Sequence, residues 1–130
     1  MAKVTLCMIV KNEQNNLIRC LNSVHKLVDE IIVVDTGSSD RTVAIAKEYA
    51  DMVDHHKWND SFADARNCAR RLVSNDWILW LDADDCLSNL TRYRLSELFQ
   101  SLSTPKAYKF YINSLFHCEI SCQQIKLYYN

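Results

Sequence analysis

Three short runs of apolar residues constrain the fold of this chain more than any other feature. They are VTLCMIV at 4–10, EIIVVD at 30–35 and WILWL at 77–81. Continuous apolar residues, rich in β-branched side chains, are typical of strands that are buried on both faces. Such strands occur mostly in parallel sheets with helices packed on either side. The sequence therefore points to a layered sheet rather than to a helical bundle.

Segments with helical spacing of apolar residues separate these strands. The helix that follows TGSSDRT has Ser39 or Asp40 in place to cap it, and the helix that begins at Phe62 has Phe62, Ala65, Ala69 and Leu72 on one face. We expect helices over 13–27, 40–49, 62–73 and 90–102, and further strands over 50–56, 107–116 and 124–129.

The alternation of strands and helices predicts an α/β fold with three layers, in which helices cover both faces of a mostly parallel sheet. A chain of 130 residues without repeats, low-complexity tracts or a linker is expected to form a single domain over 1–130. Ligands of such folds bind beyond the carboxyl ends of the strands. Candidate functional residues are therefore sought there.

Composition excludes several classes of function. Apolar residues make up 48% and charged residues 24%, and the net charge of −1 gives no reason to expect nucleic-acid binding. No apolar stretch approaches the length of a transmembrane helix. None of the six cysteines forms a CxxC pair, which favours a reduced compartment. We expect a cytoplasmic protein, with peripheral attachment to the inner face of a membrane left open.

The fourth strand ends in three carboxylates within four positions, Asp82, Asp84 and Asp85. Like charges repel one another unless a cation neutralises them. In an extended segment the side chains of Asp82 and Asp84 point the same way, so both can face one ligand. Oxygen ligands of this kind suit Mg²⁺ or Mn²⁺, which often also bind substrate phosphates. The alternative interpretation is a solvated acidic turn.

Other polar residues follow the remaining strands. Asp35 either binds the ribose or base of a nucleotide or caps the turn that follows it through an Asx hydrogen bond. The guanidinium of Arg66 suits a phosphate or a base edge, although a surface arginine is the simpler alternative. His55 and His56 are expected to be loop residues rather than ligands.

Taken together, these residues resemble family 2 glycosyltransferases, which are inverting, nucleotide-sugar-dependent enzymes with a Rossmann-like GT-A fold. Four pieces carry the resemblance in order: MIVKNE, VVDTGSSDRT, FADARN and WLDADD. The set is similar to the branch that includes lipopolysaccharide-core and peptide-modifying enzymes. The resemblance implies a UDP-sugar donor, a Mn²⁺ or Mg²⁺ cofactor, and a glycan, lipid-linked or peptide acceptor.

The resemblance also implies roles for individual residues. Metal binding falls to Asp84, with Asp82 facing both the ribose and the metal. The other residues implied in nucleotide binding are Val10, Asn12, Glu13, Asp35 and Arg66.

The catalytic base of the family does not match any residue of this chain. Glu119 is the only carboxylate after Glu97, and nothing around it resembles the base motif. We therefore expect a chain truncated at its C-terminus, with the base beyond Asn130 and the acceptor-binding part largely missing. Apolar strands exposed by that loss would favour a homodimer. The alternative function is a non-catalytic domain that binds nucleotide and metal without transferring sugar.

Two other enzyme classes fit less well. Phosphatases of the haloacid dehalogenase type use an Asp-x-Asp motif, but in the first strand and with the first aspartate as nucleophile. Nicotinamide enzymes need a glycine-rich loop, and this chain has a single glycine, Gly37.

Overall fold

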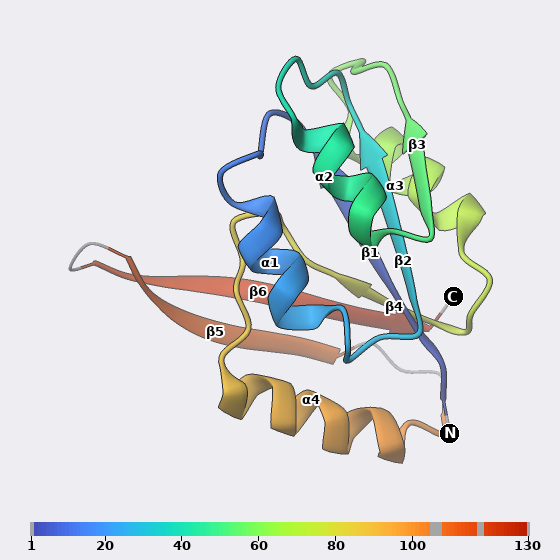
Figure 1. Ribbon diagram of the computed structural model, residues 1–130. Coiled ribbons are helices and arrows are strands. Elements are labelled where there is room, and N and C mark those ends of the chain that lie inside the picture. Colours follow the sequence, from blue (N-terminus) through green and yellow to red (C-terminus); the bar gives the residue numbers. More distant parts are fainter. Residues whose placement is uncertain (1, 105–107, 117–118, 130) are drawn as a thin grey trace.

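The computed structural model describes residues 2–104, 108–116 and 119–129 (Figure 1). Four strands alternate with four helices, and two strands follow. The strands are β1 (Val4–Val10), β2 (Glu30–Asp35), β3 (Met52–His55), β4 (Trp77–Trp80), β5 (Tyr108–Phe116) and β6 (Glu119–Tyr129). The helices are α1 (Leu17–Val24), α2 (Thr42–Tyr49), α3 (Phe62–Leu72) and α4 (Asn89–Ser101).

The strands form one sheet in the order β3-β2-β1-β4-β6-β5. The first four strands are mutually parallel, whereas β6 runs antiparallel to both β4 and β5. The predicted α/β class and mostly parallel sheet are confirmed. Parallel pairing brings the carboxyl ends of β1, β2, β3 and β4 to one edge of the sheet.

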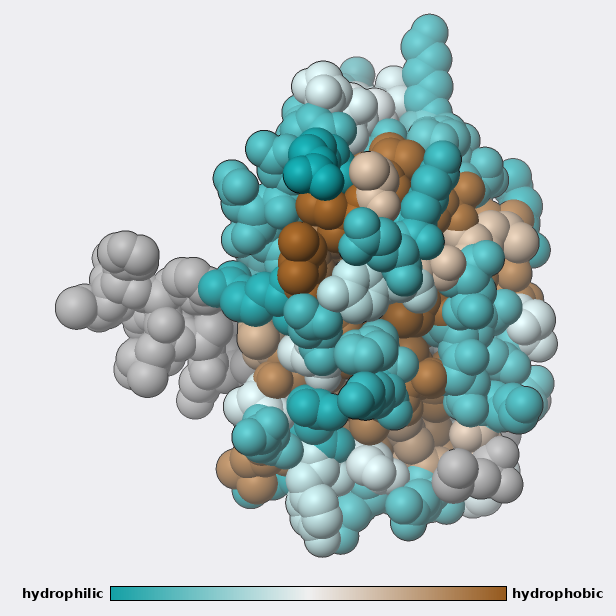
Figure 2. All heavy atoms as spheres, viewed as in Figure 1, coloured by the Kyte–Doolittle hydropathy of each residue, from teal (hydrophilic) through white to brown (hydrophobic). Residues whose placement is uncertain are grey.

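The fold has three layers, with helices on both faces of the sheet. An apolar cluster on each face of the sheet holds the layers together. The larger cluster joins the sheet to α1, α2 and α4, and the smaller one joins it to α3. Strand β1 supplies both clusters, because Leu6 and Met8 face the first and Cys7 faces the second. This explains why its sequence is apolar without alternation. On the face seen in Figure 2, hydrophobic and hydrophilic residues are interspersed.

Helix α1 is shorter than predicted. It begins at Leu17 rather than Glu13 and ends at Val24. The Glu13 N–H donates to the side chain of Thr42, the first residue of α2, and the Gln14 N–H donates to the side chain of Asp40 in the loop before it. Because these long-range bonds fix the backbone before Leu17, residues 13–16 form a turn instead of a first helical turn.

Two further differences concern side-chain exposure and strand length. Phe62 was expected on the buried face of α3 with Ala65 and Ala69, but it is 63% exposed while both alanines are buried. It is the first residue of the helix, so its side chain is not covered by the sheet. The predicted strand 124–129 begins earlier, at Glu119, because it pairs with β5 over that length; Ala107 lies outside the described residues.

Candidate functional site

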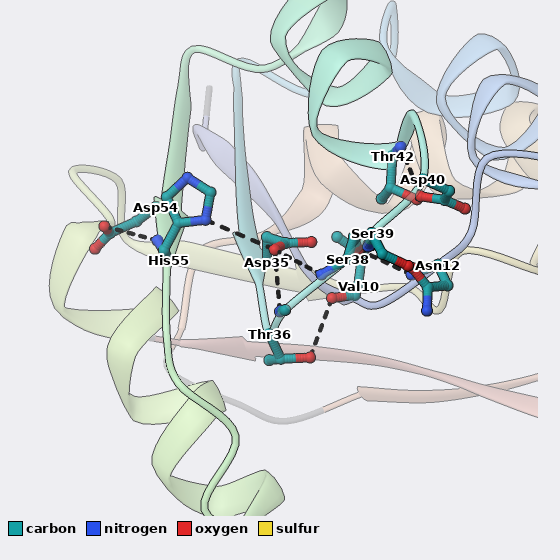
Figure 3. Close-up of polar contacts among 11 residues, drawn as sticks. Val10, Asn12, Asp35, Thr36, Ser38, Ser39, Asp40, Thr42, Asp54 and His55 are labelled. Carbon is teal, nitrogen blue, oxygen red and sulfur yellow. Dashed lines mark hydrogen bonds and ion pairs between the residues drawn. The ribbon is translucent and has the colours of Figure 1, made fainter.

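The loops after β1 and β2 are joined by reciprocal hydrogen bonds (Figure 3). Asn12 donates its backbone N–H to the Ser38 hydroxyl at 2.8 Å, and its side-chain Oδ1 accepts from the Ser39 N–H at 2.8 Å. Its backbone has a positive φ of 52°, a conformation that asparagine tolerates better than most residues. Asn12 therefore connects the two loops, a contact within the protein that the predicted nucleotide role did not include.

The same connection continues into α2. Thr42 is fully buried, and its hydroxyl accepts from the Glu13 N–H at 2.8 Å. The carboxylate of Asp40 accepts from the Thr42 N–H and hydroxyl. The N-cap position itself is held by Arg41, rather than by Ser39 or Asp40 as expected. The hydroxyl of Thr42 is the main cause that lowers the pKa of Asp40. These contacts link the start of α2 to the loop after β1.

Asp35 is only 3% exposed, and its two carboxylate oxygens differ in their surroundings. Oδ2 accepts from the backbone N–H groups of Gly37 and Ser38 at 3.0 and 3.1 Å, as the turn-capping interpretation predicts. The ring of His55 approaches the same oxygen at 3.6 Å. Oδ1 is buried without a hydrogen-bond partner among the described residues. A buried carboxylate oxygen without a partner calls for a donor from elsewhere.

A cavity of about 250 Å³ lies at the ends of β1 and β2. Two predicted nucleotide residues, Val10 and Glu13, line it. The other four, Asn12, Asp35, Arg66 and Asp82, are not part of its lining. The full lining is Ile9, Val10, Lys11, Glu13, Thr36, Trp58 and Phe62. Neither Trp58 nor Phe62 was predicted as a functional residue, since Phe62 was expected on the apolar face of its helix and no pattern singled out Trp58.

The three carboxylates after β4 lie in a turn rather than in an extended segment. The Asp85 N–H donates to the Asp82 carbonyl at 3.0 Å, and Asp85 Oδ2 accepts from the Asp82 N–H at 2.8 Å. The premise of an extended Asp82–Asp84 segment is therefore wrong. Asp82 and Asp84 are nevertheless both exposed, while Ala83 and Asp85 are buried.

Helix α1 holds this turn in place. The Cys20 thiol donates to the Asp82 carbonyl at 3.5 Å, and the Ser23 hydroxyl accepts from the Leu87 N–H at 3.0 Å. Ala83 and Leu87 are buried in the larger cluster. The turn is thus anchored on both sides of its exposed carboxylates.

The charge around Asp85 is not balanced within the described residues. Burial raises the pKa of Asp85 to about 6, and the neighbouring Asp82 and Asp84 add to the rise, against the hydrogen bond from Asp82 N–H. Its Oδ1 is buried and lacks a partner among these residues. The described part of the chain contains no preformed group of three or more metal-ligating side chains. Two exposed carboxylates still fit Mg²⁺ or Mn²⁺, which keep several waters and share substrate phosphates.

The remaining candidates lie around this edge. Arg66 is exposed, and its guanidinium lies 6.0 Å from the ring centroid of Trp80, the last residue of β4. This cation–π contact places it on the α3 side of the sheet. His56 donates its backbone N–H to the Asp35 carbonyl at 2.9 Å.

No helix among the described residues is long and apolar enough to cross a membrane.

Two curated relatives share most of this chain. It is 49% identical over 110 residues to a TPR repeat-containing protein of Synechococcus elongatus, covering 85% of this chain and 27% of that protein. It is 40% identical over 101 residues to an uncharacterized glycosyltransferase of Rickettsia felis, covering 78% of this chain and 35% of that protein. The chain therefore spans about a third or less of the length of these relatives.

Solved structures show the same fold. TarS of S. aureus, residues 1–349 in complex with UDP, superposes with a TM-score of 0.63 at 21% identity, covering 76% of this chain and 32% of that chain. Glucosyl-3-phosphoglycerate synthase of Mycobacterium tuberculosis, in complex with Mn²⁺, UDP and glucosyl-3-phosphoglycerate, gives 0.56 at 22% identity, covering 63% and 33%. Both likenesses concern the fold, which is GT-A.

The family assignment rests on the sequence. The model of glycosyl transferase family 2 matches residues 5–108, which include the carboxyl ends of β1, β2, β3 and β4. This chain therefore belongs to glycosyl transferase family 2.

Proposed function

We propose that this chain forms the donor-binding domain, over residues 1–130, of a glycosyltransferase that moves a sugar from a UDP-sugar to an acceptor with inversion. One observation carries the proposal: an exposed pair of carboxylates, Asp82 and Asp84, follows β4 at the same sheet edge as a cavity over β1 and β2. A nucleoside diphosphate could place its diphosphate at the carboxylate pair and its nucleoside in the cavity. The UDP and Mn²⁺ in the structures of similar fold support this assignment.

The nucleoside end is assigned to the β1–β2 side. Val10 and Glu13 line the cavity, and the unpaired Asp35 Oδ1 is available to accept a hydrogen bond from the base or ribose. Asn12 acts by keeping the two loops joined. Arg66, whose guanidinium lies 6.0 Å from the ring centroid of Trp80, is assigned to the base or the diphosphate.

The diphosphate end is assigned to the turn after β4. Asp84 binds a Mn²⁺ or Mg²⁺ ion, with Asp82 facing both the ribose and the ion. When bound, such an ion neutralises the charge that develops on the departing diphosphate. The chain's own contribution is to hold both carboxylates outward on a turn fixed by Asp85 and by Cys20 of α1.

An inverting transfer also needs a base that takes the proton of the acceptor hydroxyl. We place that base, and the binding of a glycan, lipid-linked or peptide acceptor, outside the residues discussed above. A domain that binds nucleotide and metal without transferring sugar remains the alternative function, and assayed transfer distinguishes the two.

The proposal is tested by calorimetric titration of UDP with Mn²⁺ and with excess chelator. UDP should bind more tightly with Mn²⁺, because the carboxylates otherwise repel the diphosphate. Asp84→Ala should lose this difference. Asp76→Ala is the matched control, since Asp76 is also exposed but precedes β4 at the opposite end of that strand. Equal UDP affinity of the unaltered chain with metal and with chelator would refute the proposed metal site.

A further inference from the structure

We propose that Trp58 and Phe62 form an aromatic wall against which the nucleobase of the donor stacks. The inference rests on the proposed function and adds to it the residues that hold the base. It starts from the position of Phe62, which is 63% exposed as the first residue of α3 and lines the cavity over β1 and β2.

The two rings form a defined pair. Their centroids are 4.8 Å apart, and their planes are inclined by 70° in an edge-to-face arrangement. Such a pair presents the edge of one ring to the face of the other. At least one aromatic face is therefore left for another flat ring. Trp58 is half-buried, so it supports the pair while Phe62 projects outward.

Hydrogen bonds within the loop that carries these rings hold their orientation. The Trp58 indole N–H donates to Asp60 Oδ1 at 3.0 Å, which sets the orientation of the ring. Asp60 adopts a positive φ of 59°. Ser61 caps α3 by accepting from the Asp64 N–H at 3.2 Å, and the Asn59 amide donates to the Asp64 carboxylate at 2.6 Å. A wall that is already in place costs little ordering entropy when a ligand binds.

The position of the wall matches one end of a nucleotide. The wall comes from the connection between β3 and α3 and from the first residue of α3, and the rest of the lining comes from β1 and from residues that follow β1 and β2. The carboxylate turn follows β4, on the other side of β1 in the sheet order. A ligand with its diphosphate at that turn therefore has its nucleoside end toward Phe62.

The size of the cavity also favours the nucleoside. Its volume of about 250 Å³ falls below the roughly 300–1,000 Å³ of pockets that enclose drug-sized ligands. It suits a base with part of its ribose rather than a complete nucleotide sugar. A planar base would stack on the aromatic wall with its face and form hydrogen bonds with the polar lining residues through its edge.

The test compares variants at Phe62 by UDP titration with Mn²⁺ and with excess chelator. Phe62→Leu removes the aromatic face and keeps an apolar side chain, whereas Phe62→Tyr keeps the ring. Tyr93→Leu is the matched control, because Tyr93 is 61% exposed and lies on α4, away from the cavity lining. Thermal unfolding confirms that each variant is folded, as expected for exposed positions.

We expect Phe62→Leu to raise the Kd of UDP roughly 5- to 100-fold, the range of base–aromatic stacking, while Phe62→Tyr and Tyr93→Leu stay within about twofold of the unaltered chain. The loss should be the same with metal and with chelator, because the wall does not contact the carboxylate turn. UDP should also change the Trp58 fluorescence, and Trp58→Phe should lose that change.

The outcomes separate this inference from the proposed function. If Phe62→Leu binds UDP as Tyr93→Leu does, while Mn²⁺ still strengthens binding to both, the aromatic wall is wrong and the donor site stands. If the unaltered chain binds no UDP in either condition, both proposals are wrong.

Discussion

At the scale of single residues, Asp35 caps a turn and keeps one oxygen that we propose for a ligand. Its Oδ2 accepts from the N–H groups of Gly37 and Ser38, and its Oδ1 has no partner among the described residues. A turn residue and a binding residue have the same signature in a sequence, because both require an acceptor at the end of a strand. Only the surroundings of each oxygen separate the two.

We predict that Asp35→Asn weakens UDP binding by about 1–3 kcal/mol, with or without metal, since a neutral amide accepts a weaker hydrogen bond than a carboxylate. The amide oxygen can still cap the turn, so stability should change little. Asp51→Asn is the control, because Asp51 also accepts a backbone N–H of β2, from Ile31 at 2.8 Å, at the other end of the strand. Unchanged UDP affinity in Asp35→Asn would leave Asp35 with its capping role alone.

Asp85 gives a prediction for the dependence of stability on pH. Burial, with the charges of Asp82 and Asp84, raises its pKa from 3.8 to about 6. The folded chain therefore holds this proton more tightly than the unfolded chain does. Relative to Asp85→Asn, the metal-free protein should be most stable below pH 4 and should lose stability as the pH rises through about 6.

Thermal unfolding of both proteins in chelator, across pH 4 to 7.5, measures this difference. Asp85→Asn keeps an oxygen that can accept the Asp82 N–H, so the turn should persist. If the melting temperatures of the two proteins changed with pH in the same way across this range, Asp85 would not be held in a buried, charged environment.

At the scale of elements, the strands were predictable and the loop contacts were not. A strand buried on both faces has a continuous apolar sequence, so β1, β2 and β4 are visible without any partner. The start of α1 depends on Thr42, which binds Glu13 N–H from a position 29 residues away. Local periodicity carries no information on such a contact, and it predicted a helix that began too early.

The connection between the two loops predicts a graded effect of substitutions at Asn12. Asn12→Ala should destabilise the chain by about 1–3 kcal/mol, because it loses the bond to Ser39 N–H and replaces asparagine, which tolerates the left-handed region, with alanine, which tolerates it less well. Asn12→Gly loses the same bond but accepts the backbone conformation, so its cost should be smaller.

Urea unfolding of both variants measures the two costs. Asn15→Ala is the control, since Asn15 is exposed in the same loop. Equal stability of Asn12→Ala and Asn12→Gly would mean that the left-handed backbone at position 12 is not retained in solution.

At the scale of the whole molecule, the predicted layers and mostly parallel sheet are confirmed, and the family match covers residues 5–108. The exposure of Phe62 was not predictable, because helical spacing identifies a face without showing where the sheet beneath it ends. The turn of Asp82–Asp85 was hidden for a similar reason: a carboxylate that accepts a backbone N–H looks, in sequence, like one that binds a ligand.

The end of the sheet leads to a prediction about association. Strand β6 pairs with β4 only over Lys126–Tyr129, while β5 pairs along all of its nine residues with β6. Within the described strands, β5 therefore has an open outer edge, and open edges promote pairing between chains. We predict concentration-dependent self-association, or a homodimer, in light scattering. A monomer at all concentrations would contradict this.

The central claim is that a nucleotide diphosphate lies across the ends of β2, β1 and β4. A crystal structure of the chain with UDP and Mn²⁺, with the anomalous signal of manganese recorded, tests it most directly. The account predicts an anomalous peak beside Asp84, the diphosphate next to it, and the uracil ring against Phe62 within reach of Asp35. A manganese peak away from the Asp82–Asp85 turn, or UDP bound elsewhere on the chain, would contradict it.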